Sequence, residues 1–363
     1  MKIALLGDIA LVGHFDINES DYQKRISNLK RMLSGCDYIV ANLESPLTTV
    51  SRTLVCKSMH IRSNPRNVKI LRDLGVNAVS LANNHVLDFG VKGLEDTIQT
   101  LTDNGIKWYG VNGKTLKVSR NNEMVSFSGF CCWSANGVGY RRHANRRGVN
   151  LLTKQALREQ LKQDQKQGFF PIMSLHWGIE HTNYPPYEYI QLMSYLSKEY
   201  RFIVHGHHPH QIQGIGKHND SLVAYSLGNA LFDDTSSLNK TFTVKMNDEN
   251  RKSFIWIIDV INGMVHNTQT IGFYNEEEKG IVPYDIQNEL MKYSSAITEI
   301  QDVDRYEQMR GEQYKNTIAS KFGKHDIHWV KSRLNYYSIG AKITSVINHK
   351  RYLKEKERML NGE

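Results

Sequence analysis

The sequence predicts an α/β fold in which helices and a second β-sheet cover a sheet of buried parallel strands. Two observations lead to this class. Over residues 1–210, short apolar runs that end in polar residues alternate with segments of helical periodicity. Between about residues 221 and 274, β-rich runs replace the helices, and we expect them to form the second sheet. Residues 281–363 have mostly helical and polar patterns, and they are expected to extend a domain that covers residues 1–280.

The predicted strands are short aliphatic runs bounded by glycine or polar residues, the pattern of strands buried on both faces. They are KIALLGD (2–8), DYIVANLES (37–45), NAVSLANNH (77–85), FFPIMSLHWG (169–178) and YRFIVHGHHPH (200–210). Each run ends in side chains that carry chemistry. Because loops at the carboxyl ends of parallel strands converge, these side chains are expected to gather at one edge of a sheet.

The predicted helices lie between these strands. Their ranges are 63–75, 90–105 and 152–168. The first shows the clearest boundaries, with Asn64 as N-cap, Pro65 at the first helical position and Gly75 after the last turn. Two hairpins are also predicted, one turning at Asn121-Asn122 and one at Asn262-Gly263, because Asn and Gly tolerate the left-handed backbone of tight turns.

The composition is that of a soluble globular protein. The four cysteines show no C-x-x-C spacing, so neither a zinc knuckle nor a disulfide framework is indicated. Asp8 interrupts the apolar N-terminus and no small-residue cleavage site follows, which argues against a signal peptide. No stretch approaches the roughly 18–20 apolar residues of a membrane helix. We therefore expect a cytoplasmic protein, with peripheral contact at the inner face of the membrane as an alternative.

The net charge of +9 is concentrated near the end of the chain. Residues 311–363 hold 11 Lys and Arg against 5 Asp and Glu, which is +6 of the total. Such a tail is compatible with a solvated helix, with an anionic membrane surface or with nucleic acid. Nucleic acid is the weakest of these hypotheses, because the charge forms no recognised nucleic-acid motif and Trp329, Tyr336 and Tyr337 fit a core equally well.

The polar residues at the strand ends are of the types that bind metal ions. They are Asp8, Asn42, Glu44, Asn83, Asn84, His85, His176, His208 and His210. Carboxylate and imidazole together suit Mn, Fe or Zn, and a carboxylate such as Glu44 can bridge two ions. Each residue alone has an ordinary alternative as a cap, a turn or a hydrogen-bonded core residue. Their coincidence at five strand ends favours a metal site.

The stretch HGHHPH (205–210) holds four of the fifteen histidines. A solvated basic tract would not follow the apolar run Phe202 to Val204 at a strand end. A His-x-His sequence stiffened by Pro209 can instead direct both flanking rings to one point. We therefore assign His208 and His210 to the metal site and give His205 and His207 supporting roles.

Six short motifs in the sequence resemble those of a known protein family. GDIAL (7–11), ANLESPLT (41–48), LANNHVLDFG (81–90), LHWGIEH (175–181), GHHPHQIQG (206–214) and YSLGNALFD (225–233) occur in this order and spacing. Together they resemble the bacterial capsule synthesis CapA family, also called poly-γ-glutamate synthesis proteins. The resemblance covers about Met1 to Asp234 and is specific, because six motifs agree. Past Tyr274 no resemblance is found.

The resemblance implies a fold similar to the calcineurin-like metallophosphoesterases: a four-layer α-β-β-α sandwich of two mixed sheets, here with a helical C-terminal extension. It also implies a centre of two divalent ions, Mn, Fe or Zn. By position, Asp8 corresponds to the first aspartate ligand and Glu44 stands at the place of the bridging aspartate. The remaining correspondences are Asn84, His176, His208 and His210 as ligands and His85 as the proton donor.

The chain departs from that pattern in two places. Metallophosphoesterases begin with an Asp-x-His pair, but position 10 is Ala10, so one ligand of the first ion is missing. Glu44 is longer than the usual aspartate by one methylene, which alters the spacing of the ions. His14 or Asp16 in the following loop are candidates to compensate. A weakened site, a different metal or a single ion are the alternatives.

The leading functional hypothesis is metal-dependent hydrolysis of a phosphate ester or related anionic bond during synthesis of a capsule or other surface polymer, either poly-γ-glutamate or polysaccharide. His85 would protonate the leaving oxygen. Asp88 would orient His85, or else cap the following helix. Glu180 and His181 are expected at the pocket rim, and Asn229 is expected to support the metal loops or close a turn.

The loop GYRRHANRRG (139–148) offers Arg141, Arg142, Arg146 and Arg147 to an anionic substrate, with a solubilising surface loop as the alternative. The second hypothesis for the whole protein is a non-catalytic assembly factor that contacts capsule synthesis proteins. The missing histidine at Ala10 and the basic tail favour this hypothesis. The many retained ligand positions oppose it.

Overall fold

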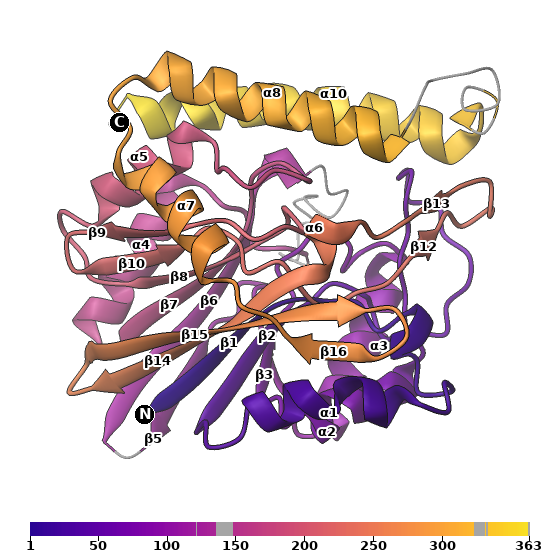
Figure 1. Cartoon of the computed structure of the whole chain (residues 1–363), viewed down its shortest axis with the longest axis horizontal. Helices are drawn as coiled ribbons and strands as arrows, with labels where there is room; N and C mark the ends of the chain where they lie inside the picture. The colour runs from indigo at the N-terminus through magenta and orange to yellow at the C-terminus, as the bar shows by residue number, and fades with distance from the viewer. Residues whose placement is uncertain (121, 136–147, 323–330, 332, 362–363) are drawn as a thin grey trace.

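The computed structural model describes residues 1–120, 122–135, 148–322, 331 and 333–361. Two mixed β-sheets are stacked face to face (Figure 1). The first sheet has the order β16 (Gly280–Pro283), β15 (Met264–Glu276), β14 (Lys252–Ile261), β1 (Lys2–Ile9), β2 (Tyr38–Leu43), β3 (Ala78–Ser80) and β4 (Lys107–Tyr109), and β11 (Asn229–Leu231) pairs with the end of β1. The second has the order β5 (Leu116–Arg120), β6 (Glu123–Cys131), β7 (Phe170–His176), β8 (Ile203–His207), β10 (Ser221–Ala224) and β9 (Ile215–His218).

The prediction of two mixed sheets is confirmed, but the assignment of the β-rich segment holds only for β10 and is wrong for the strands that follow. Strands β14 and β15 do not form the second sheet; they extend the first, with β14 antiparallel to β1. Strands β7 and β8 form the centre of the second sheet instead. Alternating apolar runs show that a strand is buried, but they do not show which of two stacked sheets it joins, because both sheets share one core. The predicted turn at Asn262-Gly263 is present, with φ of +53° and +67°.

Helices cover the outer faces of both sheets, which completes the four layers. On the first sheet lie α1 (Tyr22–Met32), α2 (Val68–Asp73) and α3 (Gly90–Asp103), and α4 (Lys154–Lys166) and α5 (Tyr187–Leu196) lie on the second. Asn64 caps the start of its helical segment as predicted, and its side chain accepts from the Arg66 N–H. Helices α1 and α5 were not predicted, although α1 has recognisable boundaries in the sequence: Asp21 is its N-cap residue, and Gly35, with φ of +82°, follows its last turn.

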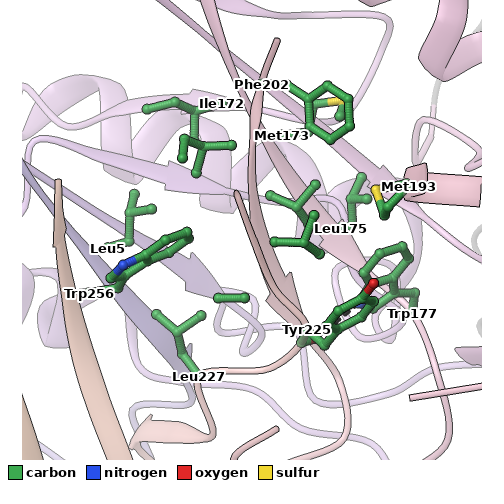
Figure 2. Close-up of a cluster of buried hydrophobic side chains, with 14 of the residues drawn as sticks. Leu5, Ile172, Met173, Leu175, Trp177, Met193, Phe202, Tyr225, Leu227 and Trp256 are labelled. Carbon is green, nitrogen blue, oxygen red and sulfur yellow. Dashed lines mark hydrogen bonds between the residues drawn. The ribbon is translucent and has the colours of Figure 1, made fainter. Parts of the chain in front are cut away.

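The main core fills the space between the sheets and continues beneath α5 (Figure 2). Leu5 of β1 and Trp256 of β14 lie on the same side of β7 as Ile172, whereas Leu175 lies on the other face of β7, toward Met193 of α5; all these side chains are buried. The side chains of β1 alternate: Ile3 and Leu5 join this core, whereas Ala4 and Leu6 belong to the cluster beneath α1 to α3. This alternation is the expected consequence of burying a strand on both faces.

The two sheets are tied together at His205. Its Nε2 donates to the carbonyl oxygen of Leu6 in β1 at 2.6 Å, and its Nδ1 accepts from the Ser174 hydroxyl at 3.1 Å. The ring is fully buried, and both nitrogens have partners. The first histidine of HGHHPH is therefore a link between sheets, which agrees with the supporting role expected for it.

Gly206, the next residue, allows the backbone at the end of β10 to lie close to β8 within the second sheet. A Cβ at this position would lie 2.1 Å from the carbonyl oxygen of Tyr225. We expect Gly206→Ala to reduce the free energy of unfolding by about 3 kcal/mol, because backbone would have to shift in a packed core. Urea denaturation would measure the loss. Gly311→Ala is the matched control, since nothing lies within 4 Å of a Cβ there. Equal stability of Gly206→Ala and wild type would contradict the close approach of the strands.

Helices α7 (Gln287–Thr298), α8 (Val303–Phe322) and α10 (Tyr336–Leu360) follow the last strand, and α8 and α10 run along one edge of the molecule (Figure 1). They are fastened to the second sheet's side of the domain. The Tyr306 hydroxyl donates to the Pro185 carbonyl at 2.7 Å, and Glu355 accepts from the Lys154 N–H at 2.9 Å. Among the described residues, no helix combines the length and apolar character required to cross a membrane.

Short elements complete the chain between β11 and β14. They are the hairpin of β12 (Thr235–Ser236) and β13 (Thr243–Val244) and the one-turn helix α6 (Asp248–Arg251). This segment stands beside the carboxyl ends of the central strands (Figure 1).

Candidate metal centre

The strand register brings the predicted ligands to one edge of the sandwich. In the first sheet, Asp8 of β1 pairs with Asn42 of β2, and Glu44 follows directly. In the second sheet, His176 at the end of β7 pairs with His207 at the end of β8. Because both sheets present carboxyl ends at the same place, residues far apart in sequence become neighbours. This is the position at which open α/β sheets bind ligands.

One group of metal-type donors consists of Asp8, Glu44 and His176. Each residue offers one ligand atom, and these atoms lie within 4.8 Å of one another. All three side chains are fully buried. The Asn42 amide donates to Asp8 Oδ1 at 2.9 Å, and His176 Nδ1 lies 3.7 Å from Glu44 Oε1.

A second group consists of Glu180, His208 and His210, whose ligand atoms also lie within 4.8 Å of one another. The backbone is left-handed at His208 and His210, with φ of +97° and +56°. Non-glycine residues rarely adopt this conformation, and where they do they cluster at functional sites. Both rings of the His-Pro-His segment lie near the first group: the His176 and His208 ring centroids are 4.7 Å apart, and His210 Nε2 lies 3.9 Å from Glu44 Oε2.

Glu44 lies between the two groups. Its Oε1 is 3.7 Å from His176 Nδ1, and its Oε2 is 3.9 Å from His210 Nε2. Among the described residues, neither oxygen has a hydrogen-bond donor, although the side chain is fully buried. Burial, and then the neighbouring Asp8 carboxylate, raise the pKa of Glu44 well above its usual range. A buried carboxylate without donors is costly, and a divalent cation would relieve that cost.

The imidazoles are suited to the same role. Burial lowers the pKa of His208 to about 4, and burial together with His208 lowers the pKa of His176 well below its usual range. Both rings are therefore neutral at pH 7, the form that binds metal. Burial opposes ionisation of Asp8, but His207, His210 and His176 outweigh it and hold the pKa of Asp8 below its usual range. Neutral imidazoles beside one ionised carboxylate form a donor set that fits a divalent ion.

Asn83 and Asn84 hold the turn that follows β3. The Asn83 amide donates to the Leu43 carbonyl at 2.8 Å, and its Oδ1 accepts from the His85 N–H at 3.0 Å. Asn84 Oδ1 lies 3.0 Å from His176 Nε2, so Asn84, predicted as a ligand, contacts a member of the first donor group.

His85 and Asp88 are in direct contact. Asp88 Oδ2 lies 2.7 Å from His85 Nδ1 and also accepts from the Ile61 N–H at 2.8 Å. The N-cap of α3 is Phe89, so Asp88 does not cap that helix. Burial opposes ionisation of Asp88, but Lys57 and then His85 offset it and lower its pKa. Burial and Lys57 lower the pKa of His85.

A cavity of about 100 Å³ opens beside the second group. Its polar lining includes His85, Glu180, His181 and His210, so the rim position expected for Glu180 and His181 agrees with the structure. Met59, Ile61, Phe232, Val244 and Met246 supply the apolar lining. The proton donor implied by the resemblance and the second donor group thus face one space.

Three further residues contact the site: His207 and Asn229, for which supporting roles were expected, and Lys57, which was not anticipated. His207 Nδ1 lies 2.9 Å from Asp8 Oδ1, and Asn229 Oδ1 lies 2.9 Å from His210 Nδ1. Lys57 Nζ lies 2.9 Å from Asp88 Oδ1. The motifs HGHHPH and YSLGN pointed to the first two as supporting residues. Nothing in the sequence around Lys57 distinguishes it from a surface lysine.

Position 10 is not compensated by the candidates named from the sequence. The His14 N–H and its Nδ1 both contact Asp233 Oδ2, at 2.7 Å and 2.8 Å. Asp16 accepts from the Asn67 amide at 3.1 Å. Both side chains are therefore engaged outside the two donor groups. The four candidate substrate-binding arginines (Arg141, Arg142, Arg146 and Arg147) lie outside the described residues.

Comparison with known proteins agrees with the sequence motifs. The family model described as "Bacterial capsule synthesis protein PGA_cap" matches residues 2–234. The PGA biosynthesis protein CapA of Bacillus subtilis is 29% identical over 245 residues, which are 64% of this chain and 63% of that protein. The capsule biosynthesis protein CapA of Bacillus anthracis is 26% identical over 249 residues, which are 64% of this chain and 60% of that protein. The matched region thus spans less than two thirds of either relative.

Among solved structures, the chain is similar to a 5′-nucleotidase precursor of Thermus thermophilus, with a TM-score of 0.45 and 11% identity over 83% of this chain and 60% of that one. It is also similar to the calcineurin-like phosphoesterase YfkN of Bacillus subtilis, with a TM-score of 0.38 and 13% identity over 89% of this chain and 98% of that one. The family-model match covers more than half of the sequence and includes both donor groups. This chain therefore belongs to the bacterial capsule synthesis family PGA_cap.

Proposed function

We propose that this protein is a metal-dependent hydrolase that acts on a phosphate ester or related anionic bond in the synthesis of a surface polymer, poly-γ-glutamate or polysaccharide. The observation that carries the proposal is Glu44, a fully buried carboxylate without a hydrogen-bond donor among the described residues, placed between two groups of donors. The names of the similar Bacillus proteins supply the polymer context.

The residues would divide the work as follows. The ions would be held by Asp8, Glu44, His176, Asn84, Glu180, His208 and His210. A divalent ion in such a site polarises a phosphoryl oxygen and supplies a nucleophilic water at neutral pH. Asp88 accepts from His85 Nδ1–H and opposes the lowering of the His85 pKa by burial and Lys57, so it favours the protonated ring, whose Nε2–H would be donated to the leaving oxygen. The apolar wall of the cavity, including Met59 and Ile61, limits access of water.

A second candidate function is a non-catalytic assembly factor for capsule synthesis proteins. One observation favours it: Ala10 supplies no ligand, and His14 and Asp16 are engaged elsewhere. In this case the donors would hold an ion for structure alone. The two candidates differ in one measurable property, turnover by the metal-loaded protein.

The first test compares wild type with the His208→Ala/His210→Ala double variant. We expect elemental analysis to find one or two Mn, Fe or Zn ions per wild-type chain and clearly fewer in the variant, because two ligands of the second group are removed. Hydrolysis of an aryl phosphate with added Mn²⁺ should fall by at least about 10²-fold in the variant.

His218→Ala is the matched control, since that histidine contacts the Tyr225 hydroxyl at 2.9 Å and belongs to neither donor group. It should keep both metal and turnover. Wild-type protein that stays folded and inert with Mn, Fe or Zn would overturn the hydrolase proposal. Metal bound without turnover would leave the assembly factor as the better description.

A further inference from the structure

Residues 49–61 form a strap without regular secondary structure that crosses beside the metal centre. Its one buried cation is Lys57, whose side chain is 9% exposed. The ammonium donates to the Asn84 carbonyl at 2.7 Å and to Asp88 Oδ1 at 2.9 Å, and it lies 3.0 Å from His85 Nδ1. These contacts hold the residues on both sides of His85 in place. They fix Asn84, which precedes it in the chain, and Asp88, whose carboxylate accepts from its ring.

The strap also forms a wall of the cavity. Met59 and Ile61 line the space that His85 faces, and the Ile61 N–H donates to Asp88 Oδ2 at 2.8 Å. Lys57 and Ile61 therefore hold the two oxygens of Asp88 from the same segment. If the strap moves, both hydrogen bonds and the wall of the cavity are lost together.

Helix α10 fastens this strap from the outside. The Tyr337 hydroxyl donates to the Thr53 carbonyl at 3.0 Å, and the Tyr337 ring packs edge-on against His60 at 5.1 Å. The Tyr336 hydroxyl donates to the Leu54 carbonyl at 3.3 Å. Gly340 packs so closely on the strap that an added Cβ would lie 2.6 Å from both Cβ and Sγ of Cys56. The helix belongs to the extension, more than 100 residues beyond the end of the family match at 234.

We infer that Lys57 is a positioning residue of the His85 turn and that the C-terminal extension is part of the site, because α10 holds the strap that carries Lys57. The extension thereby supports, from outside the cavity, the strap whose Met59 and Ile61 line it. A lysine suits this task, since its ammonium donates to a carbonyl and a carboxylate at once while it lies beside the His85 ring. The effect of Lys57 on the rate of hydrolysis rests on the proposed function. The contact by which α10 holds the strap does not depend on that function.

The fastening is tested by hydrogen exchange of the backbone amides of residues 53–61. Gly340→Ala should speed exchange at Ile61 by about tenfold or more, because the new methyl group displaces the strap from α10 and weakens its hydrogen bond to Asp88. Gly311→Ala in α8, with nothing within 4 Å of its Cβ, should leave these amides unchanged. Combining Gly340→Ala with Cys56→Gly removes both clashing atoms and should restore protection. Unchanged exchange in Gly340→Ala would overturn the inference, whether or not the protein is an enzyme.

The positioning role is tested on turnover of the Mn²⁺-loaded protein. Lys57→Met should lower kcat by about 10- to 100-fold with KM and bound metal unchanged, since His85 is displaced while the donors stay in place. Lys57→Arg, which keeps a cation, should recover part of the loss. A fall in metal content, or equal kcat in Lys57→Met and wild type, would refute the assignment. If wild type itself shows no turnover, the proposed function fails while the exchange experiment still decides the fastening.

Discussion

Glu44→Gln is expected to abolish the stabilisation of this protein by divalent metal without weakening the metal-free fold. Glu44 is buried between the two donor groups, and its carboxylate has no hydrogen-bond donor among the described residues. Glutamine keeps the shape and removes the charge that burial opposes, so the metal-free variant should unfold at the same temperature as wild type or higher. With Mn²⁺ at about 1,000 times its Kd, wild type should gain about 4 kcal/mol, whereas the variant should gain little.

Thermal unfolding with and without Mn²⁺ measures both effects, and hydrolysis of an aryl phosphate should be lost in parallel. Glu188→Gln is the matched control, because Glu188 is equally buried but has partners in Tyr352 and Lys356. The control should lose stability and keep its response to metal. A metal-free Glu44→Gln protein that is destabilised by several kcal/mol would instead make Glu44 a structural anchor.

The strand-end pattern predicted most of the centre, because local sequence determines both a strand and the residue that follows it. Asp8, Glu44 and His176 each end a buried apolar run, and the structure brings them together. The resemblance to the CapA family added roles that the residue types alone leave open. Left-handed backbone at His208 and His210 is a consequence of the turn itself and could only be guessed from Pro209.

What the sequence did not predict depends on contacts between distant segments. Lys57 reaches the His85 turn from a strap with no periodicity, and Tyr337 fastens that strap from 284 residues further along the chain. The difference between the predicted and the observed sheet of β14 has the same origin. The sequence of β14 is consistent with either sheet, and only its pairing with β1 decides between them. Such contacts are decided by packing, which leaves no local pattern.

His85→Gln is expected to slow hydrolysis by an amount that depends on the leaving group. If His85 donates a proton to the leaving oxygen, an alkyl phosphate should lose about 10²- to 10⁴-fold in kcat, since an alkoxide is a poor leaving group without protonation. An aryl phosphate with an acidic phenol needs little help and should lose far less. Bound metal should not change, because His85 lies outside both donor groups. The comparison is made on one variant with two substrates, so errors in protein concentration cancel.

Asp88→Asn extends this test to the partner of His85. The amide can still accept from Ile61 but no longer matches the charges of Lys57 and an imidazolium, so we expect a smaller loss with the same dependence on the leaving group.

Equal losses on both substrates in His85→Gln would show that His85 acts through structure, since a displaced turn impairs every substrate alike. Loss of metal would make it a ligand. Only a loss of kcat that is confined to substrates with poor leaving groups would identify His85 as the proton donor to the leaving oxygen.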